Sequence, residues 1–428
     1  MIFDVIVVGG GPGGLTAAWK SARLGLSTLV IEKKRHISEN RRANTCFLHV
    51  CPGLYGENVS MRRRPGESRI VFQENGFSLR YTGDHFDYYD SYLSSPSGSK
   101  LHLRGENRPL GAVFDMDAVL SDLLREASDW GAGFLTSALV IGGENQNNKA
   151  RVKVKKGRKT FCLEARKVLV AEGLSSRVVE SLGLNKKRHY LAKIPFLQYT
   201  LEGVEFPLEP GVFSIWGSPW VYMAPDATGK NRWVVISGPS LPARDCKSNM
   251  EYFLKESTYS SWFKKAYPVK KLAATVEGFI PLVEPCQGNF LILGESTGCG
   301  ETQVHGAMIC GWWAGDAVYD ELSGKEGYRG YQEKWIKSFP CCEEKGQMAL
   351  MKNALVQNFF SNKEIDYLFS LSDGKMITGG PGNPYVAIER MMNLFATQPR
   401  IKGEMAEKVE KFKNLTLKEV QQLFLNLQ

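Results

Sequence analysis

The order of apolar and polar residues predicts strand, helix and strand at the start of the chain. Residues 4–8 are almost continuously apolar, which is typical of a strand buried on both faces of a parallel sheet. Small and apolar residues then recur at helical spacing, at Leu15, Ala18 and Ala22. A second apolar run ends at Glu32. Together the three segments predict a βαβ unit.

The rest of the chain predicts a mixed α/β protein without internal repeats. After a polar, arginine-rich stretch with short alternating segments, helical and strand-like spacings follow one another. The last hundred residues or so have mostly helical spacing. In chain order, the predicted elements are strands at 68–72 and 76–81, a helix at 114–127, a hairpin at 150–164, a strand at 165–173, strands between 190 and 280 with a helix at 247–265, a strand at 289–293 and a helix at 304–321.

Five glycines and a proline connect the first strand to its helix. Gly9 permits a tight turn, Gly11 lets the backbone approach a pyrophosphate, and Gly14 lets the helix pack on the sheet. Gly13 belongs to the same turn, and Pro12 suits a first helical position. The N–H groups and positive dipole end of such a helix favour a phosphate. A tight turn without a ligand is the alternative.

Glu32 ends the second strand, where a carboxylate can accept hydrogen bonds from both hydroxyls of a ribose. The same carboxylate would repel a 2′-phosphate. A strand before the glycines, a helix after them and an acid at this distance make the turn alone a poor explanation. The unit therefore predicts a site for an adenine dinucleotide.

Composition excludes several other classes of protein. The chain has 428 residues, ordinary apolar and charged fractions and no apolar run long enough to span a membrane, so we expect a cytoplasmic protein of two or three units.

Nine scattered cysteines without a CxxC pair argue against a disulfide framework and against a metal site. The net charge of +9 lies in separate basic clusters that suit an anionic substrate, an acidic electron donor or peripheral contact with an anionic membrane. Aromatic residues do not interleave with these clusters, so we expect no nucleic-acid partner.

Three segments together resemble the FAD-binding signature of the flavoprotein hydroxylase superfamily, which includes the geranylgeranyl reductase family. They are the glycine unit, Glu172-Gly173 after an apolar strand, and Gly294-Glu295 followed by Gly298. Superfamily members usually have Asp where this chain has Glu172 and Glu295. The resemblance implies that Glu295 accepts a hydrogen bond from a ribityl hydroxyl of FAD. A surface acid at the end of a strand is the alternative for both residues.

Trp220-Val-Tyr222-Met-Ala-Pro225 is similar to the aromatic motif that roofs the substrate cavity in the geranylgeranyl reductases. Two aromatic residues at a period of two lie on one face of a strand, where they would line an apolar slot. Flavin halogenases carry a similar segment, and a half-buried strand has the same pattern. The resemblance assigns Trp220, Tyr222 and Pro225 to substrate binding.

Archaeal reductases of this family carry a cysteine soon after the first βαβ unit, and Cys46 matches its position. The resemblance implies a thiol near the flavin that could protonate an alkene carbon, with a packed thiol as the alternative. His49 or His305 could serve instead, and we assign His305 to the substrate. Many relatives also carry an arginine where this chain has Val113, so that contact would come from Arg41 or Arg42.

The fold expected is α/β, with an FAD-binding Rossmann-like domain, a mixed β-sheet substrate domain and a C-terminal helical region. The expected function is FAD-dependent saturation of carbon–carbon double bonds in a prenyl or other apolar substrate, with or without a phosphate. The alternative is a monooxygenase or halogenase acting through a flavin hydroperoxide. Electrons would come from NADPH, NADH or a ferredoxin, because no second glycine fingerprint follows another βαβ unit.

These expectations assign residues and domain limits as follows. The predicted FAD-binding residues are Gly9, Gly11, Pro12, Gly13, Gly14, Glu32, Lys33, Arg41, Arg42, Cys46, Glu172, Gly173, Gly294, Glu295 and Gly298. The predicted limits are 1–80, 105–178 and 276–325 for the FAD-binding domain, 81–104 and 179–275 for the substrate domain, and 326–428 for the helical region.

Overall fold

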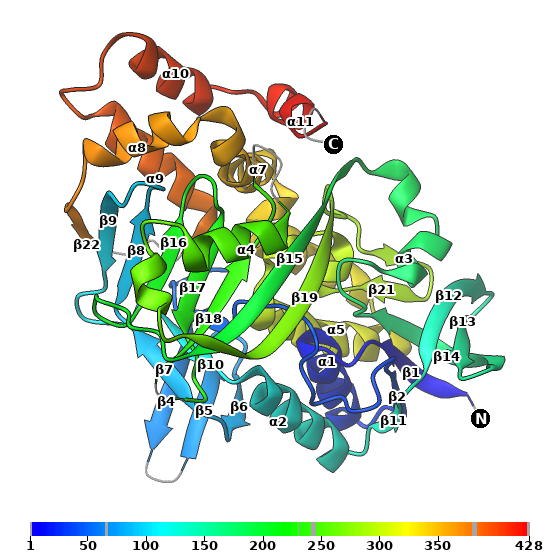
Figure 1. Ribbon diagram of the computed structural model, residues 1–428. Coiled ribbons are helices and arrows are strands. Elements are labelled where there is room, and N and C mark those ends of the chain that lie inside the picture. The colour runs from blue at the N-terminus through cyan, green and yellow to red at the C-terminus, as the bar shows by residue number, and fades with distance from the viewer. Residues whose placement is uncertain (1, 65–66, 230, 241–244, 379–382, 426–428) are drawn as a thin grey trace.

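The computed structural model describes residues 2–64, 67–229, 231–240, 245–378 and 383–425 (Figure 1). Within these residues, two eight-stranded sheets lie side by side, and most of the helices after α5 cover the far end of the second sheet.

The first sheet contains the parallel strands that the opening of the chain predicts. Helix α1 (Pro12–Arg23) connects β1 to β2, and α5 (Gln303–Leu322) packs against α1. The two helices approach closely, because a Cβ at Gly311 would lie 2.2 Å from the carbonyl oxygen of Gly13. The strands, in spatial order, are β11 (Gly133–Leu135), β2 (Thr28–Ile31), β1 (Phe3–Val8), β14 (Lys159–Val170), β13 (Lys149–Lys156) and β12 (Leu139–Gln146), with β21 (Phe290–Ile292) beside β14 and β20 (Cys286–Gln287) beside β21.

The second sheet is mixed, because β16 is parallel to β8 and β22 is parallel to β9 while the other pairs are antiparallel. Its strands, in spatial order, are β19 (Tyr267–Phe279), β15 (Tyr190–Glu202), β18 (Arg232–Ser237), β17 (Val221–Pro225), β16 (Val212–Ile215), β8 (Asp90–Ser94), β9 (Lys100–Arg104) and β22 (Met376–Thr378). Strands β15 and β19 are long and reach from this sheet toward the first one (Figure 1).

Two three-stranded sheets and the remaining helices complete the fold. The small sheets are β3 (Phe47–His49), β10 (Gly111–Phe114) and β7 (His85–Tyr88), and β4 (Val59–Arg64), β5 (Glu67–Phe72) and β6 (Phe77–Tyr81). The remaining helices are α2 (Met116–Asp129), α3 (Arg177–Ser181), α4 (Cys246–Lys255), α6 (Gly327–Ser338), α7 (Glu344–Phe359), α8 (Asn362–Ser370), α9 (Pro384–Ala396), α10 (Gly403–Lys413) and α11 (Leu417–Leu425).

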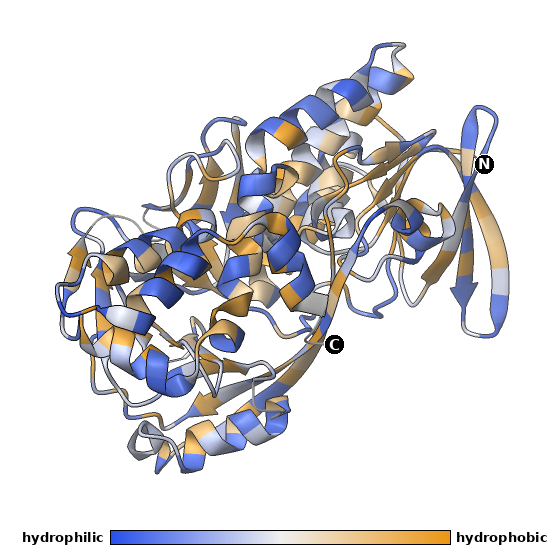
Figure 2. Ribbon diagram, turned by 90° about the horizontal axis from the view of Figure 1, so that it is seen from above, coloured by the Kyte–Doolittle hydropathy of each residue, from blue (hydrophilic) through white to orange (hydrophobic). Residues whose placement is uncertain are grey.

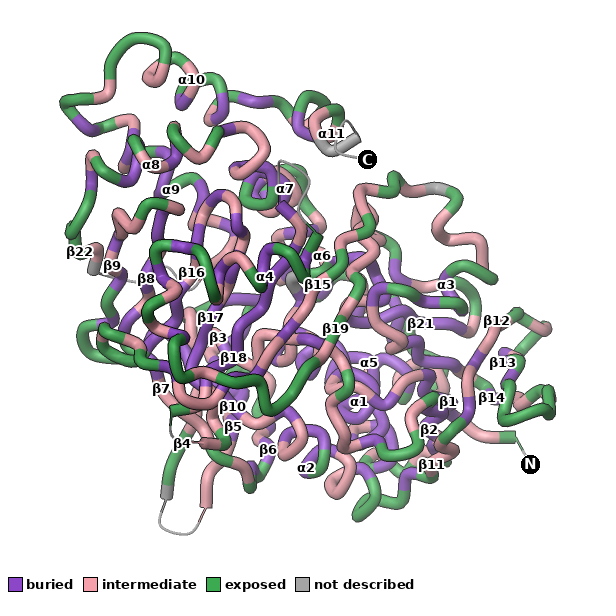
Figure 3. Tube along the Cα trace, viewed as in Figure 1, coloured by how far each residue is buried: buried purple, intermediate pink, exposed green. Residues whose placement is uncertain are grey.

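One large apolar cluster lies between the first sheet and the helices α1 and α5, and another packs the second sheet against α4. Figure 2 shows apolar residues concentrated along the strands, with hydrophilic residues on the outer faces of the helices. Figure 3 shows buried residues in β1, β21 and α5, and β21 is buried along its whole length. A rigid sheet of this kind holds the loops at its carboxyl edge in fixed positions.

One predicted element is wrong in extent. The helix predicted at 247–265 ends as α4 at Lys255, and β19 begins at Tyr267 after a short 3₁₀ turn. The side chain of Ser257 donates to the carbonyl oxygen of Phe253 at 2.6 Å, and such local bonds favour helix ends.

The domain limits given above stay a prediction. Sheet pairing crosses these limits, since β7 pairs with β10, β22 pairs with β9, and β15 pairs with the part of β19 that lies beyond residue 275.

Candidate functional site

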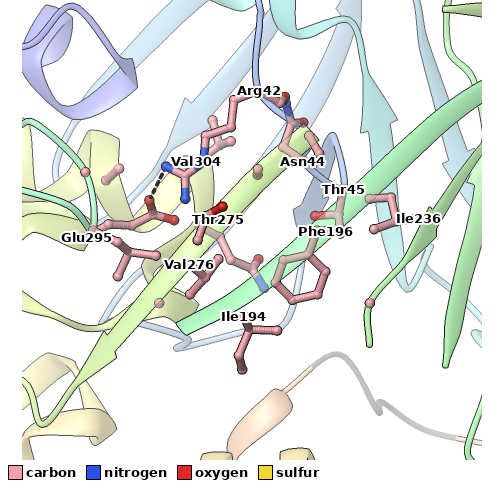
Figure 4. A pocket seen from close by; sticks show the side chains of 18 of the residues that line it. Arg42, Asn44, Thr45, Ile194, Phe196, Ile236, Thr275, Val276, Glu295 and Val304 are labelled. Carbon is pink, nitrogen blue, oxygen red and sulfur yellow. Dashed lines mark hydrogen bonds and ion pairs between the residues drawn. The ribbon is translucent and has the colours of Figure 1, made fainter. Parts of the chain in front are cut away.

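A cavity of about 2020 Å³ extends from the carboxyl edge of the first sheet to the inner face of the second. Ligands of open α/β sheets bind at this edge, where loops from several parallel strands meet. The cavity is lined by the loops after β1, β2, β14 and β21, by strands β15, β17 and β19, and by helices α7 and α9. Figure 4 shows part of the wall, with Arg42 and Glu295 on one side and Phe196 and Ile194 on another.

The glycine turn after β1 has the shape that a pyrophosphate needs. Gly9 has a φ of +106°, and a Cβ there would lie 2.2 Å from the carbonyl oxygen of Ala171. A Cβ at Gly14 would lie 2.0 Å from the carbonyl oxygen of Gly9, so α1 packs directly on the turn. Gly11 caps α1 without a side-chain hydrogen bond, and no described atom lies within 4 Å of a Cβ built there. An open helix start of this kind fits a phosphate.

Glu32 lines the cavity with its carboxylate held in one orientation. The residue is only 5% exposed. One oxygen accepts from the Gly10 N–H at 2.6 Å, and the other accepts from the Lys34 N–H at 2.8 Å. Each carboxylate oxygen retains a further lone pair, which suits a diol such as a ribose. Lys33, also on the lining, is exposed.

Glu172 lines the cavity, but its carboxylate already accepts two hydrogen bonds from its own segment. One oxygen accepts from the Ser176 hydroxyl at 2.6 Å and from the Val178 N–H at 2.9 Å at the start of α3. Burial raises the pKa of Glu172. Gly173, with a φ of +81°, turns the chain after it. This carboxylate oxygen of Glu172 therefore stabilises the start of α3.

Glu295 and Arg42 meet on one side of the cavity although they are 253 residues apart in the sequence. An Arg42 nitrogen lies 3.3 Å from a Glu295 oxygen, as the dashed line in Figure 4 shows. Gly294 and Gly298 flank Glu295 with φ values of +59° and +101°. Gly294 lies on the lining, whereas Gly298 faces Arg188 outside it, since a Cβ there would be 2.5 Å from the guanidinium.

The two candidate arginines have different surroundings. Arg41 lines the outer part of the cavity and donates to Glu39 at 2.7 Å at the surface. Arg42 points inward to Glu295. Val113 is 1% exposed in β10 and is not on the cavity lining.

Cys46 lies on the lining in a strained backbone conformation, with a φ of +50°. Its thiol donates to the side-chain oxygen of Asn44. The backbone N–H of Asn44 donates to the side-chain oxygen of Gln198 at 2.9 Å. Burial raises the pKa of Cys46, so the sulfur holds its proton at neutral pH. Strained residues of this kind gather at functional sites.

The aromatic alternation has the predicted orientation. Trp220 and Tyr222 lie on the cavity side, while Val221 and Met223 between and beyond them are fully buried on the other side of β17. Burial raises the pKa of Tyr222 well above its usual value. Pro225 is in β17 but does not reach the described lining.

His305 does not reach the described lining either, whereas His49 does. His305 is 0% exposed and lies behind His49, with their ring centroids 6.0 Å apart. Neither ring has a hydrogen-bond partner among the described residues. Burial lowers the pKa of His49 to about 3 and that of His305 as well, so both rings are uncharged.

Several lining residues were not expected from the sequence. Those from the second sheet, in β15, β18 and β19, are apolar or small, and alternation along β15 is their only signal in the sequence. They are Asn44, Thr45, Ile194, Phe196, Ile236, Thr275, Val276 and Val304 (Figure 4), and Leu350, Ala354 and Ala387 from α7 and α9. The described residues include no cluster of acids, histidines and cysteines that could hold a metal ion. Over the same residues no helix has the length and hydropathy needed to cross a bilayer.

Comparison with known proteins adds three findings. Residues 4–37 match the profile of a family described as FAD dependent oxidoreductase. The chain is 24% identical over 390 residues to the digeranylgeranylglycerophospholipid reductase of Methanocaldococcus jannaschii, covering 87% of this chain and 90% of that protein. It is 25% identical over 394 residues to digeranylgeranylglycerophospholipid reductase 1 of Methanopyrus kandleri, covering 81% and 91%.

Solved structures share the fold. A geranylgeranyl bacteriochlorophyll reductase-like protein from Thermoplasma acidophilum has a TM-score of 0.71 at 18% identity, covering 96% of this chain and 99% of that chain. A flavin-dependent brominase has a TM-score of 0.61 at 14% identity, covering 97% and 98%. The expected architecture, a Rossmann-like sheet, a mixed second sheet and C-terminal helices, is confirmed.

Proposed function

We propose, from the premise that this chain is an FAD-dependent oxidoreductase related to the digeranylgeranylglycerophospholipid reductases, that it saturates carbon–carbon double bonds in a prenyl or similarly apolar substrate. FAD bound in this cavity would supply the hydride chemistry for such a reaction, with electrons from NADPH, NADH or a ferredoxin.

The size and lining of the cavity carry this proposal. Ligand pockets usually occupy about 300–1,000 Å³, and this cavity has about 2020 Å³. It therefore has room for a dinucleotide at the glycine turn and for a second ligand beside it. The wall opposite the turn contains Ile194, Phe196, Trp220 and Val276. Burying a hydrocarbon there contributes about 0.8 kcal/mol for each methylene.

At the dinucleotide end, the start of α1 binds the pyrophosphate and Glu32 accepts hydrogen bonds from the ribose. The loop of Gly294 and Glu295 receives the ribityl and flavin portion, and Arg42 orients Glu295. The fit of these groups to FAD rests on the open helix start at Gly11 and on the fixed carboxylate of Glu32.

On the substrate side, the apolar wall excludes water and holds the double bond. Cys46 holds a proton on its sulfur, because burial keeps the thiol uncharged. Delivery of that proton to the alkene carbon that does not receive hydride completes the saturation, and general acids act in this way. Asn44 orients the thiol.

The test is a single turnover without oxygen. The purified FAD-loaded protein is reduced with dithionite and mixed with geranylgeraniol or geranylgeranyl diphosphate, and the product is analysed by mass spectrometry. We expect a gain of two hydrogen atoms for each bond saturated. The protein left oxidised is the control.

The reaction of the reduced protein with oxygen distinguishes a reductase from the alternative, a monooxygenase or halogenase. A monooxygenase or halogenase would convert its reduced flavin rapidly into an oxygen adduct, visible by stopped-flow absorbance. Such an adduct, together with an unchanged lipid, would contradict the proposal.

A further inference from the structure

A chain of hydrogen bonds runs behind the part of the cavity wall that carries Trp216 and Trp220. Asn362, the first residue of α8, accepts from the Ser218 N–H at 2.9 Å and donates to the Ser218 carbonyl oxygen at 2.8 Å. One side chain of the C-terminal region thus pairs with both backbone polar groups of a single residue in the loop between β16 and β17, 144 residues away.

The chain continues into the core through side chains. The Ser218 hydroxyl lies 2.8 Å from the Ser240 hydroxyl, which donates to Asn249 at 2.9 Å. Asn249 in turn donates to the carbonyl oxygen of Gly238 at 2.7 Å. Ser240 is 5% exposed and Asn249 is 0% exposed. Ser218 and Asn362 are half-buried. A network whose members are all paired holds one arrangement of the backbone.

The backbone that this network holds is cavity wall. Trp216, Gly217 and Trp220 flank Ser218 on the lining, and Gly238 and Ser240 lie on it as well. The ring of Trp216 packs 6.2 Å from that of Phe369 in α8. Figure 1 shows α8 with the other C-terminal helices beyond the ends of the strands of the second sheet.

The segment is also tightly enclosed. A Cβ at Gly217 would lie 3.0 Å from the Asn362 side-chain oxygen and 2.9 Å from the ring of Pro96. Residue 217 therefore has no room for a side chain, and a shift of this backbone away from α8 breaks both bonds to Asn362.

We infer that Asn362 is a positioning residue for substrate selection: acting through Ser218, it fixes Trp216 and Trp220 and thereby sets which apolar chain fits the cavity. This rests on the proposed function, since it concerns the same substrate wall. The C-terminal region then contributes to selectivity from outside the wall itself.

The test compares Asn362→Ala with Lys363→Ala, an exposed neighbour in the same turn of α8. Binding of farnesol and of geranylgeraniol to the oxidised FAD-loaded protein is followed by the change in flavin absorbance, and KM and kcat are measured with the same alcohols. For Asn362→Ala we expect the dissociation constant of geranylgeraniol to rise about tenfold, the equivalent of one net hydrogen bond. We also expect the preference between the two alcohols to change about threefold or more, with kcat and the affinity for FAD within about twofold.

Asn362→Asp keeps an acceptor for the Ser218 N–H but loses the donor to the Ser218 carbonyl oxygen, so it should also raise the dissociation constant of geranylgeraniol. This variant decides the question if Asn362→Ala does not fold. The inference would be overturned if the folded variants bound the alcohols as the natural protein does. It would also be overturned if Lys363→Ala weakened alcohol binding as much as Asn362→Ala, or if Asn362→Ala weakened FAD binding as much as it weakened alcohol binding.

The two hypotheses fail separately. If the natural protein binds the alcohols without reducing them, and Asn362→Ala still changes their binding, the proposed function fails and the positioning role stands. If the natural protein binds neither alcohol, the inference is overturned.

Discussion

Glu32→Gln tests the dinucleotide site most directly. The carboxylate accepts from two backbone N–H groups, at 2.6 Å from Gly10 and 2.8 Å from Lys34. An amide has one acceptor oxygen, so one of these N–H groups would face an NH₂ donor. Leaving a buried donor unpaired costs about 1–3 kcal/mol. Because the group is 5% exposed, solvent offers little compensation.

The same substitution weakens the bonds to the ribose. Hydrogen bonds to charged groups contribute about 1.5–3 kcal/mol, and about 1.4 kcal/mol is a factor of ten in affinity. We therefore expect the Kd for FAD to rise roughly 10- to 100-fold, and the free energy of unfolding of the apoprotein to fall by about 1–3 kcal/mol.

The assay is titration of the apoprotein with FAD, followed by quenching of flavin fluorescence, with urea unfolding measured in parallel. Glu39→Gln is the matched control, because it makes the same change at an exposed carboxylate bonded to Arg41. Its Kd should stay within about twofold of that of the natural protein. A folded Glu32→Gln protein that binds FAD within about threefold of the natural affinity would refute the assignment of Glu32 to the ribose.

Three further changes have defined outcomes. Gly14→Ala places a Cβ 2.0 Å from the Gly9 carbonyl oxygen. It should lower the free energy of unfolding by about 1–3 kcal/mol and reduce the amount of flavin that the protein binds. A full flavin content would contradict the close packing of α1. Burial lowers the pKa of His49 to about 3, so below about pH 6.5 the unfolded state binds more protons and stability falls by up to about 1.4 kcal/mol per pH unit. His49→Leu should flatten this dependence in urea unfolding between pH 7 and pH 5, and exposed His36→Gln should not; equal slopes would disprove it. Tyr222→Phe removes a buried hydroxyl without a hydrogen-bond partner among the described residues, so unfolding should be unchanged or shifted to higher temperature, and a large loss of stability would reveal a missed partner.

Much of the dinucleotide half could be predicted because its signals are local. The apolar run of β1, the glycine turn and Glu32 lie within one short stretch, and backbone sterics force these residue types there. FAD as the cofactor is confirmed by the family match over residues 4–37 together with the shared fold. The assignments of single residues to FAD or to substrate stay predictions.

Other assignments depend on packing that no local pattern records. Glu172 has the sequence of a cofactor acid, yet one of its oxygens is bonded to α3. His305 has the chemistry of a substrate residue, yet α5 buries it behind His49. The helix predicted at 247–265 was too long, because helical spacing persists past the point where Ser257 bonds back to α4.

The sequence by itself determined the βαβ unit, the glycine turn after β1 and the strand alternation of Trp220 and Tyr222, because each depends on neighbours within a few residues. Only the tertiary structure decided that Arg42 meets Glu295 across 253 residues and that Asn362 holds Ser218 across 144. Such pairs form when sheet topology and helix packing bring distant segments together. The spacing of apolar residues predicts single helices and strands, but it does not predict which of them will lie side by side.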